Sequence, residues 1–188
     1  TYSAVRSLYD DGASKAQEAT RDYVLKVEKD GGAPLMNVFG GKITTFRRLA
    51  ETALQRIGPS IGTKGKPWTA SATLPGGDFA VDQVEARIEE LLSRYPFLDP
   101  RHARRLIRQY GTKAGTLLGT ASTASDLGRR FGADLYQVEV DYLMSQEWAC
   151  EPDDVLWRRT KLGLRADETD HNELGAYMSD ARTALQAG

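Results

Sequence analysis

Hydrophobic and polar residues alternate near the start of the chain in a way that predicts a β-hairpin. Over residues 21–28 apolar and polar side chains alternate with a period of two, which is typical of a half-buried strand. A turn signal follows at Asp30, Gly31 and Gly32, and residues 35–39 form a short, mostly apolar run that suits a buried strand. Two strands joined by a short polar loop predict a hairpin.

The spacing then changes to that of a helix. Apolar residues recur at intervals of four over residues 43–57 and predict a helix there. Thr44 or Thr45 is suited to capping its start, and Gly58 with Pro59 is expected to end it. The stretch from there to residue 78 contains several glycines and prolines without a clear period, so we expect a linker.

The second half of the chain shows helical spacing throughout. Its first apolar face carries Val81, Val84, Ile88, Leu91, Leu92 and Tyr95. Asp99 followed by Pro100 supplies an N-cap and a first-turn proline for the next helix, which Gly111 is expected to close. Later helices are expected at residues 135–142, 152–163 and 174–185. None of them is apolar all round, so each is expected to bury one face in a small helical bundle.

Together these patterns predict an α+β fold that is mainly α. Residues 1–68 are expected to hold the hairpin and its helix, and residues 69–188 an all-α helical domain. The 188 residues, 40% of them hydrophobic, suit one or two soluble domains with a core. The 25 basic and 26 acidic residues give a formal net charge of −1, which argues against a nucleic acid as partner.

Cysteine and histidine are too scarce for the common structural sites. Cys150 is the single cysteine, so a disulfide within the chain is impossible, and His102 and His171 are too scattered to predict a metal site. No stretch approaches the roughly 20 apolar residues that span a bilayer. The chain starts without methionine and without a signal-peptide pattern, so we expect it to be an internal part of a longer chain.

A candidate anion site lies where the second predicted strand meets the helix. Gly40 and Gly41 allow close approach of a ligand to the backbone, Lys42 adds a mobile cation, and the helix start at Ile43 and Thr44 offers unpaired N–H groups. The glycine spacing is not that of a phosphate-binding P-loop. A plain strand-to-helix turn with a surface lysine explains the segment equally well.

Two arginines are further candidates for binding an anion. Arg21 precedes the first strand, and an arginine grips phosphate in a bidentate fork. From that segment alone, pairing of Arg21 with a neighbouring carboxylate is the stronger interpretation. Arg6 precedes Asp10 and Asp11, and an exposed salt bridge to either explains it as well.

Several segments occur in an order that resembles the C-terminal part of the FAD-dependent, quinone-linked glycerol-3-phosphate dehydrogenases. They are residues 5–8 (VRSL), 20–23 (TRDY), 39–45 (FGGKITT), 74–77 (LPGG), 94–98 (RYPFL), 126–128 (DLG) and 156–163 (LWRRTKLG). The resemblance covers nearly the whole chain, and its last segment is specific. Ser7 and Phe46 depart from it, since the family commonly has proline and tyrosine there; the second change removes a hydroxyl group.

The resemblance implies a fold, a reaction and a set of site residues. Residues 1–68 would be the C-terminal segment of a domain that binds FAD and substrate, and residues 69–188 a separate helical domain. The family oxidises sn-glycerol 3-phosphate to dihydroxyacetone phosphate by hydride transfer to FAD, and the flavin then reduces a membrane quinone. Arg6, Arg21 and Lys42 would bind the substrate. The cofactor would be contacted by Gly40, Gly41, Lys42, Ile43 and Thr44.

The resemblance also implies what the chain lacks. No residue of this chain is expected to be catalytic, because the general base would belong to an N-terminal FAD domain, and the chain alone is predicted to be inactive. A cytoplasmic enzyme peripherally associated with the inner membrane is implied, with a homodimer as a further possibility. Two rival functions remain: a fragment of another FAD-dependent enzyme resembling amine or amino-acid oxidases, and a helical interaction module.

A basic helix leaves three interpretations open. It carries Arg101, His102, Arg104, Arg105 and Arg108. A solvated face with acidic neighbours is favoured, followed by contact with an anionic lipid surface, and a nucleic acid is the weakest. Trp148 and Trp157 would suit membrane anchors, although packing in the core is the stronger expectation for both.

Overall fold

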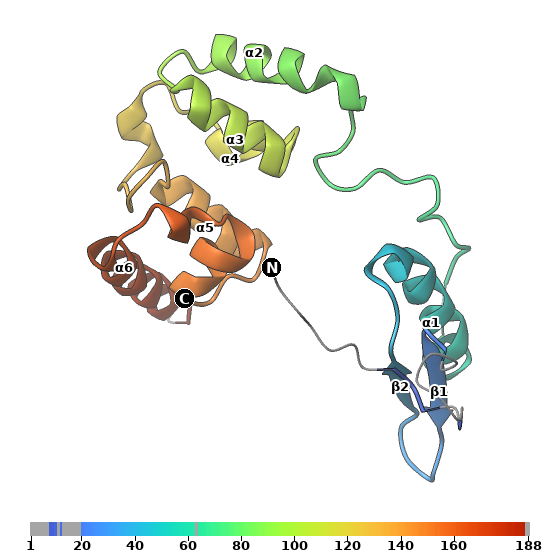
Figure 1. Cartoon of the computed structure of the whole chain (residues 1–188). Coiled ribbons are helices and arrows are strands. Elements are labelled where there is room, and N and C mark those ends of the chain that lie inside the picture. Colours follow the sequence, from blue (N-terminus) through green and yellow to red (C-terminus); the bar gives the residue numbers. More distant parts are fainter. Residues whose placement is uncertain (1–7, 11, 13–19, 63, 187–188) are drawn as a thin grey trace. The chain divides into compact units, whose positions relative to one another are not determined.

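The computed structural model describes residues 8–10, 12, 20–62 and 64–186, and it has two compact units, Thr1–Ala72 and Thr73–Gly188. Figure 1 shows that the structure is mainly helical, with one small sheet in the first unit, as predicted. Strand β1 (Val24–Glu28) pairs antiparallel with β2 (Leu35–Phe39), so the predicted hairpin is confirmed.

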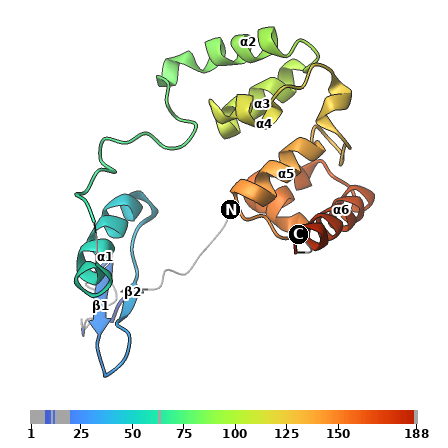
Figure 2. The same ribbon diagram turned by 180° about the vertical axis from the view of Figure 1, so that it is seen from behind.

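Helix α1 (Phe46–Ile61) follows a single 3-10 turn, η1 (Ile43–Thr45), and lies beside the hairpin (Figure 2). The Tyr23 hydroxyl, just before β1, lies 3.2 Å from the Thr52 hydroxyl of α1 and links the two elements. The unit therefore consists of one hairpin held against one helix.

Both ends of this helix differ from the prediction. Thr45, one of the two predicted threonines, is the N-cap of α1, but its hydroxyl donates to the carbonyl of Lys42 instead of accepting an N–H of the helix. The helix continues through Gly58 and Pro59 and ends at Gly62, whose φ of 71° allows its N–H to bond the carbonyl of Gly58. A proline in the last turn removes only one backbone bond, so the helix ends where a residue adopts positive φ.

The first unit buries few of its large apolar side chains. Leu25 is the only described strand residue that is buried. The exposed ones are Leu35, Val38, Phe39, Ile43, Phe46, Leu54, Ile61 and Trp68. So many exposed apolar side chains on a small unit are typical of a surface that other protein covers.

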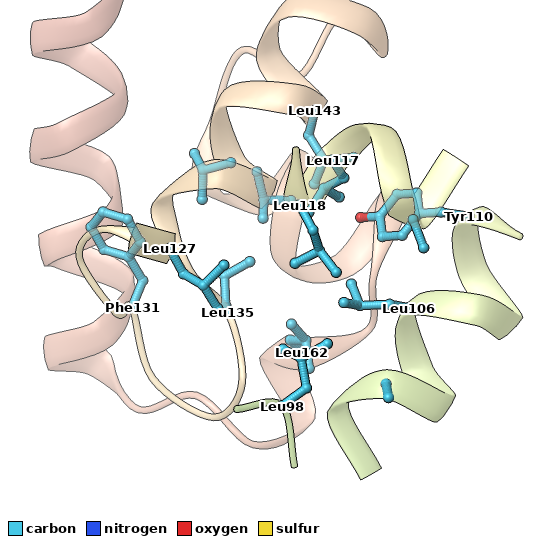
Figure 3. Close-up of a cluster of buried hydrophobic side chains, with 14 of the residues drawn as sticks. Leu98, Leu106, Tyr110, Leu117, Leu118, Leu127, Phe131, Leu135, Leu143 and Leu162 are labelled. Carbon is cyan, nitrogen blue, oxygen red and sulfur yellow. The ribbon is translucent and has the colours of Figure 1, made fainter. Parts of the chain in front are cut away.

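The second unit is the predicted bundle. Its α-helices are α2 (Val84–Arg94), α3 (Pro100–Tyr110), α4 (Lys113–Leu118), α5 (Gln137–Gln146) and α6 (Glu168–Gln186). Figure 3 shows leucine, tyrosine and phenylalanine side chains from α3, α4, α5 and the connecting loops converging on one interior. The predicted cap of α3 is confirmed, because the Asp99 carboxylate accepts the N–H of Arg101 at 2.8 Å, and Gly111 ends that helix.

Three details of this unit differ from the expectations. The short helix α4 and a 3-10 turn, η3 (Ala124–Leu127), had no clear periodic signal. The helix opened by Pro152 becomes a π-helix, η4 (Asp154–Arg159), and ends at Thr160, before Gly163. The expectation that both tryptophans pack in the core is wrong. Trp148 lies in the turn after α5, with a φ of 54°, and is 83% exposed, and Trp157 is 40% exposed.

Two glycines allow a close backbone crossing between the start of the unit and the end of α3. The N–H of Thr112 donates to the carbonyl of Gly76 at 3.1 Å, and a Cβ on Gly111 would collide with that same carbonyl oxygen. Gly111 also has a φ of 54°. The LPGG segment therefore has a structural role, because it packs main chain against main chain.

We expect Gly111→Ala to destabilise the second unit more than Gly119→Ala. Gly119 has a similar φ of 57° but open space around its position, so alanine there costs only the backbone strain, about 1–2 kcal/mol. Gly111→Ala adds the collision with Gly76. Urea unfolding of both variants measures the difference, and equal losses would show that the crossing relaxes freely.

Candidate functional site

Two of the predicted cations lie just beyond the open end of the hairpin. The ladder ends where Val24 pairs with Phe39, and Arg21 and Lys42 each lie three residues beyond this pair, on the two chains that leave the open end. The chains stay close beyond the ladder, since a Cβ on Gly41 would lie 3.6 Å from the Cβ of Tyr23. Arg21 and Lys42 are both exposed. Within the described part of the chain, neither has a carboxylate in ion-pair range.

The turn between β2 and the helix presents backbone donors at this end. Gly40 and Gly41 have φ of 66° and 111°, values that favour glycine, and they turn the chain from the strand into η1. Lys42 is the N-cap of the 3-10 turn η1 and makes no side-chain capping bond, and Ile43 is 91% exposed. The N–H groups at the start of such a helix carry a partial positive charge. Arg6 and Ser7 lie outside the described residues.

The basic helix α3 is only partly a solvated face. Arg104 forms an exposed, bidentate pair with Glu85 of α2, at 2.7 and 2.5 Å, which matches the expected acidic neighbour. Arg101 and Arg108 are also exposed. His102 and Arg105 are the exceptions, because His102 is buried and the Arg105 side chain is 15% exposed.

Arg105 is the centre of a buried polar network between α3 and α5. Its guanidinium donates to both carboxylate oxygens of Glu139 at 2.6 and 2.7 Å and to the carbonyl of Asp134 at 2.9 Å. The Tyr110 hydroxyl donates to Glu139 at 2.7 Å. Burial disfavours the charged form of Arg105, but its hydrogen bonds and charge pairing with Glu139 prevail and raise the pKa of the guanidinium. Burial, with the charge of Glu139, raises the pKa of Tyr110.

Sequence reasoning missed this network. Glu139 lies on an otherwise apolar helix face, which is the one signal that was available, but its partners are 29 and 34 residues away. The network has the properties of a structural element. It is enclosed, and the charge of Arg105 is paired with that of Glu139, as a charge buried in a protein requires.

The specific segment at residues 156–163 also has a structural role. Arg159 donates to the carbonyl of Glu147 at 2.6 Å, and the Thr160 hydroxyl donates to the carbonyl of Val155 at 2.7 Å. Asp154 accepts the N–H of Cys150 at 2.8 Å. This hydrogen bond lowers the pKa of Asp154 and outweighs the opposite effect of burial. The segment closes the π-helix, so its residues contribute to folding.

The described residues carry no group of three or more His, Cys, Asp and Glu side chains able to hold a metal ion. Of the helices that the structure describes, none combines the length and apolar character needed to cross a membrane.

Comparison with known proteins assigns the chain to a family. Residues 67–179 match the model of the C-terminal domain of alpha-glycerophosphate oxidase. The chain is 44% identical over 179 residues to a glycerol-3-phosphate dehydrogenase of Pseudomonas aeruginosa, covering 95% of the chain and 35% of that protein. It is 47% identical over 171 residues to the aerobic glycerol-3-phosphate dehydrogenase of Escherichia coli, covering 89% and 34%.

A third relative, the D-erythritol 1-phosphate dehydrogenase of Brucella abortus, is 41% identical over 181 residues, covering 96% of the chain and 36% of that protein. The chain thus spans about a third of the length of these relatives. The match to more than half of the chain shows that it belongs to the family of the alpha-glycerophosphate oxidase C-terminal domain, as the resemblance in its sequence implied.

Proposed function

We propose that this chain is the C-terminal part of an FAD-dependent oxidoreductase that oxidises sn-glycerol 3-phosphate to dihydroxyacetone phosphate. The proposal is supported by the positions of Arg21 and Lys42, which both lie within three residues of the open end of the hairpin, where the next helix begins. A dianionic phosphate requires fixed cations and N–H donors, and a guanidinium supplies a bidentate pair of them. In this proposal Arg6 joins Arg21 and Lys42 at the substrate.

The residues at the Gly40–Gly41 turn fit the electron-accepting edge of a flavin. Bound FAD would accept the hydride, and negative charge would then develop on its ring system. Gly40 and Gly41 have no side chain to obstruct a ring, and the N–H groups at Ile43 and Thr44 with the Lys42 ammonium would stabilise that charge. The exposed apolar side chains of the first unit would pack against the rest of the FAD domain.

The wider setting of the enzyme is also part of the proposal. Electrons would pass to a membrane quinone, and the enzyme would be a cytoplasmic homodimer that is peripheral on the inner membrane. Because the general base and the remainder of the FAD site would be supplied by an N-terminal domain, the chain alone would be inactive. The amine-oxidase-like and interaction-module functions lose support, because the three named relatives are all dehydrogenases of phosphorylated alcohols.

The test is turnover by a full-length protein that contains this chain, with glycerol 3-phosphate, D-erythritol 1-phosphate and free amino acids as substrates and an artificial quinone as acceptor. We expect FAD-dependent reduction of the quinone with glycerol 3-phosphate at the highest kcat/KM. D-erythritol 1-phosphate is expected to be a slower substrate, since the cations at the hairpin would bind the phosphate group of either compound. Turnover of amino acids only, or of glycerol 3-phosphate by the isolated chain, would refute the proposal.

A further inference from the structure

A cavity lies in the helical unit, and nothing in the proposed function uses it. Its volume is about 320 Å³, which is in the range of small-molecule sites. The walls come from the start of α3, from η3 and from the loops around residues 130–136 and 165. Leu98 and Leu127, labelled in Figure 3, with Phe97 and Tyr136, give it an apolar side.

Three arginines line the cavity, and two of them have no acidic partner. Within the described residues, Arg101 has no carboxylate in ion-pair range, and Arg130 donates from Nε, at 2.6 Å, and from Nη2 to the carbonyl of Ala133, which leaves its charge uncompensated and its Nη1 free. Arg165 is 3.7 Å from Asp134. Guanidinium groups that line one cavity and keep free N–H groups are suited to binding phosphate.

The two carboxylates that line the cavity are already engaged by the protein. Asp99 accepts the N–H of Arg101 as the cap of α3. Asp134 lies 3.2 Å from Nε of Arg105, and its Oδ1 is enclosed by the protein. The cavity is therefore expected to attract an anion, because three guanidinium groups line it against two carboxylates, and one of these, Asp134, is already paired with Arg105.

His102 is an unpartnered polar side chain in the wall of this cavity. It is 6% exposed, and its ring stacks on Tyr136 with 5.5 Å between centroids. In the described part of the chain, the ring nitrogens of His102 make no hydrogen bond. They are not completely enclosed by protein either, in contrast to the unbonded atoms Arg105 Nε and Asp134 Oδ1. The nitrogens thus remain accessible from the cavity. Burial, together with the charge of Arg105, lowers the pKa of His102, so at neutral pH the ring has one donor and one acceptor for a hydroxyl group.

We propose that this cavity binds a small phosphate monoester carrying a hydroxyl group, with Arg101, Arg130 and Arg165 holding the phosphate and His102 hydrogen-bonding the hydroxyl. All of the residues of this site belong to the helical unit, whereas those of the hairpin site belong to the first unit. It gives that unit a ligand-binding role that the oxidation reaction does not require.

The two histidines of the chain allow a direct test by NMR of their ring carbons. His171, 45% exposed and beside Asp153, acts as an internal reference, and a His171→Gln variant assigns the signals. Titration of the 188-residue chain with inorganic phosphate and with sn-glycerol 3-phosphate is expected to shift the His102 signal saturably and to leave His171 unchanged. Calorimetry then gives the affinities.

Variants separate the cavity from other phosphate sites. Arg101→Ala combined with Arg130→Ala is expected to weaken binding about tenfold or more, since each removes a charge-assisted contact. Arg104→Ala, on the same helix but paired with Glu85 outside the cavity, is the matched control and should bind normally. Arg21→Ala should leave the response of the His102 signal unchanged, so this result is separate from any loss of binding at the hairpin and from failure of the proposed function.

Two outcomes would overturn the proposal. One is a His102 signal that does not respond to either phosphate compound, or responds equally in the double variant. The other is binding of the chain to phosphatidylglycerol vesicles, lost in the double variant, without any response to the free compounds, because the arginines would then recognise a lipid surface.

Discussion

In a full-length protein that contains this chain, Arg21→Ala is expected to lower kcat/KM for glycerol 3-phosphate by about 100-fold or more. A guanidinium that holds a phosphate through two charge-assisted hydrogen bonds contributes about 1.5–3 kcal/mol for each bond, and about 1.4 kcal/mol corresponds to a factor of ten. Lys42→Met is expected to have a similar effect. Steady-state kinetics with purified enzyme measures both.

The controls for this experiment come from the same unit. Arg56 is an exposed arginine in the later half of α1, and Lys29 lies at the opposite, closed end of the hairpin. Arg56→Ala and Lys29→Met remove the same kinds of charge away from the helix start and the open end, so they should leave kcat/KM unchanged. Inhibition by inorganic phosphate should weaken in parallel with the loss in Arg21→Ala. If the Arg21 and Lys42 variants behave like their controls, the phosphate is bound elsewhere.

The second large effect is expected in the stability of the helical unit. Glu139→Gln should lower the free energy of unfolding by about 3–5 kcal/mol, because it leaves the buried Arg105 without its main counter-charge. The side chain keeps its shape, so the loss reports the charge and not a cavity. Urea unfolding monitored by far-UV circular dichroism is the measurement.

A neighbouring arginine provides the matched comparison. Arg104 forms a pair of the same chemistry with Glu85, but both side chains are about half exposed, so water and salt screen the attraction. Arg104→Ala should leave the free energy of unfolding almost unchanged. Replacing Arg105 and Glu139 together by methionine and leucine should restore part of the loss, since no unpaired charge is then buried. Equal losses for Glu139→Gln and Arg104→Ala would show that the buried network contributes no more than a surface pair.

Local patterns were enough to predict most elements of this protein. The alternation over residues 21–28 and the run at 35–39 predicted the hairpin, because side chains of a strand alternate between two faces. Asp99 and Gly111 marked both ends of α3, because capping depends on a few adjacent residues. The residues of the hairpin site were also named from sequence, although their joint role in binding a phosphate remains a prediction.

The burial of charge was decided by the tertiary structure alone. Arg104 and Arg105 are adjacent and identical in the sequence, yet one faces Glu85 at the surface and the other faces Glu139 in the interior. The difference arises because α5, more than 30 residues away in sequence, packs over one side of α3. The cavity that joins Arg101, Arg130 and Arg165 has the same origin. A periodic pattern specifies which face of a helix is apolar, but only the packing of distant elements determines which polar groups that face encloses.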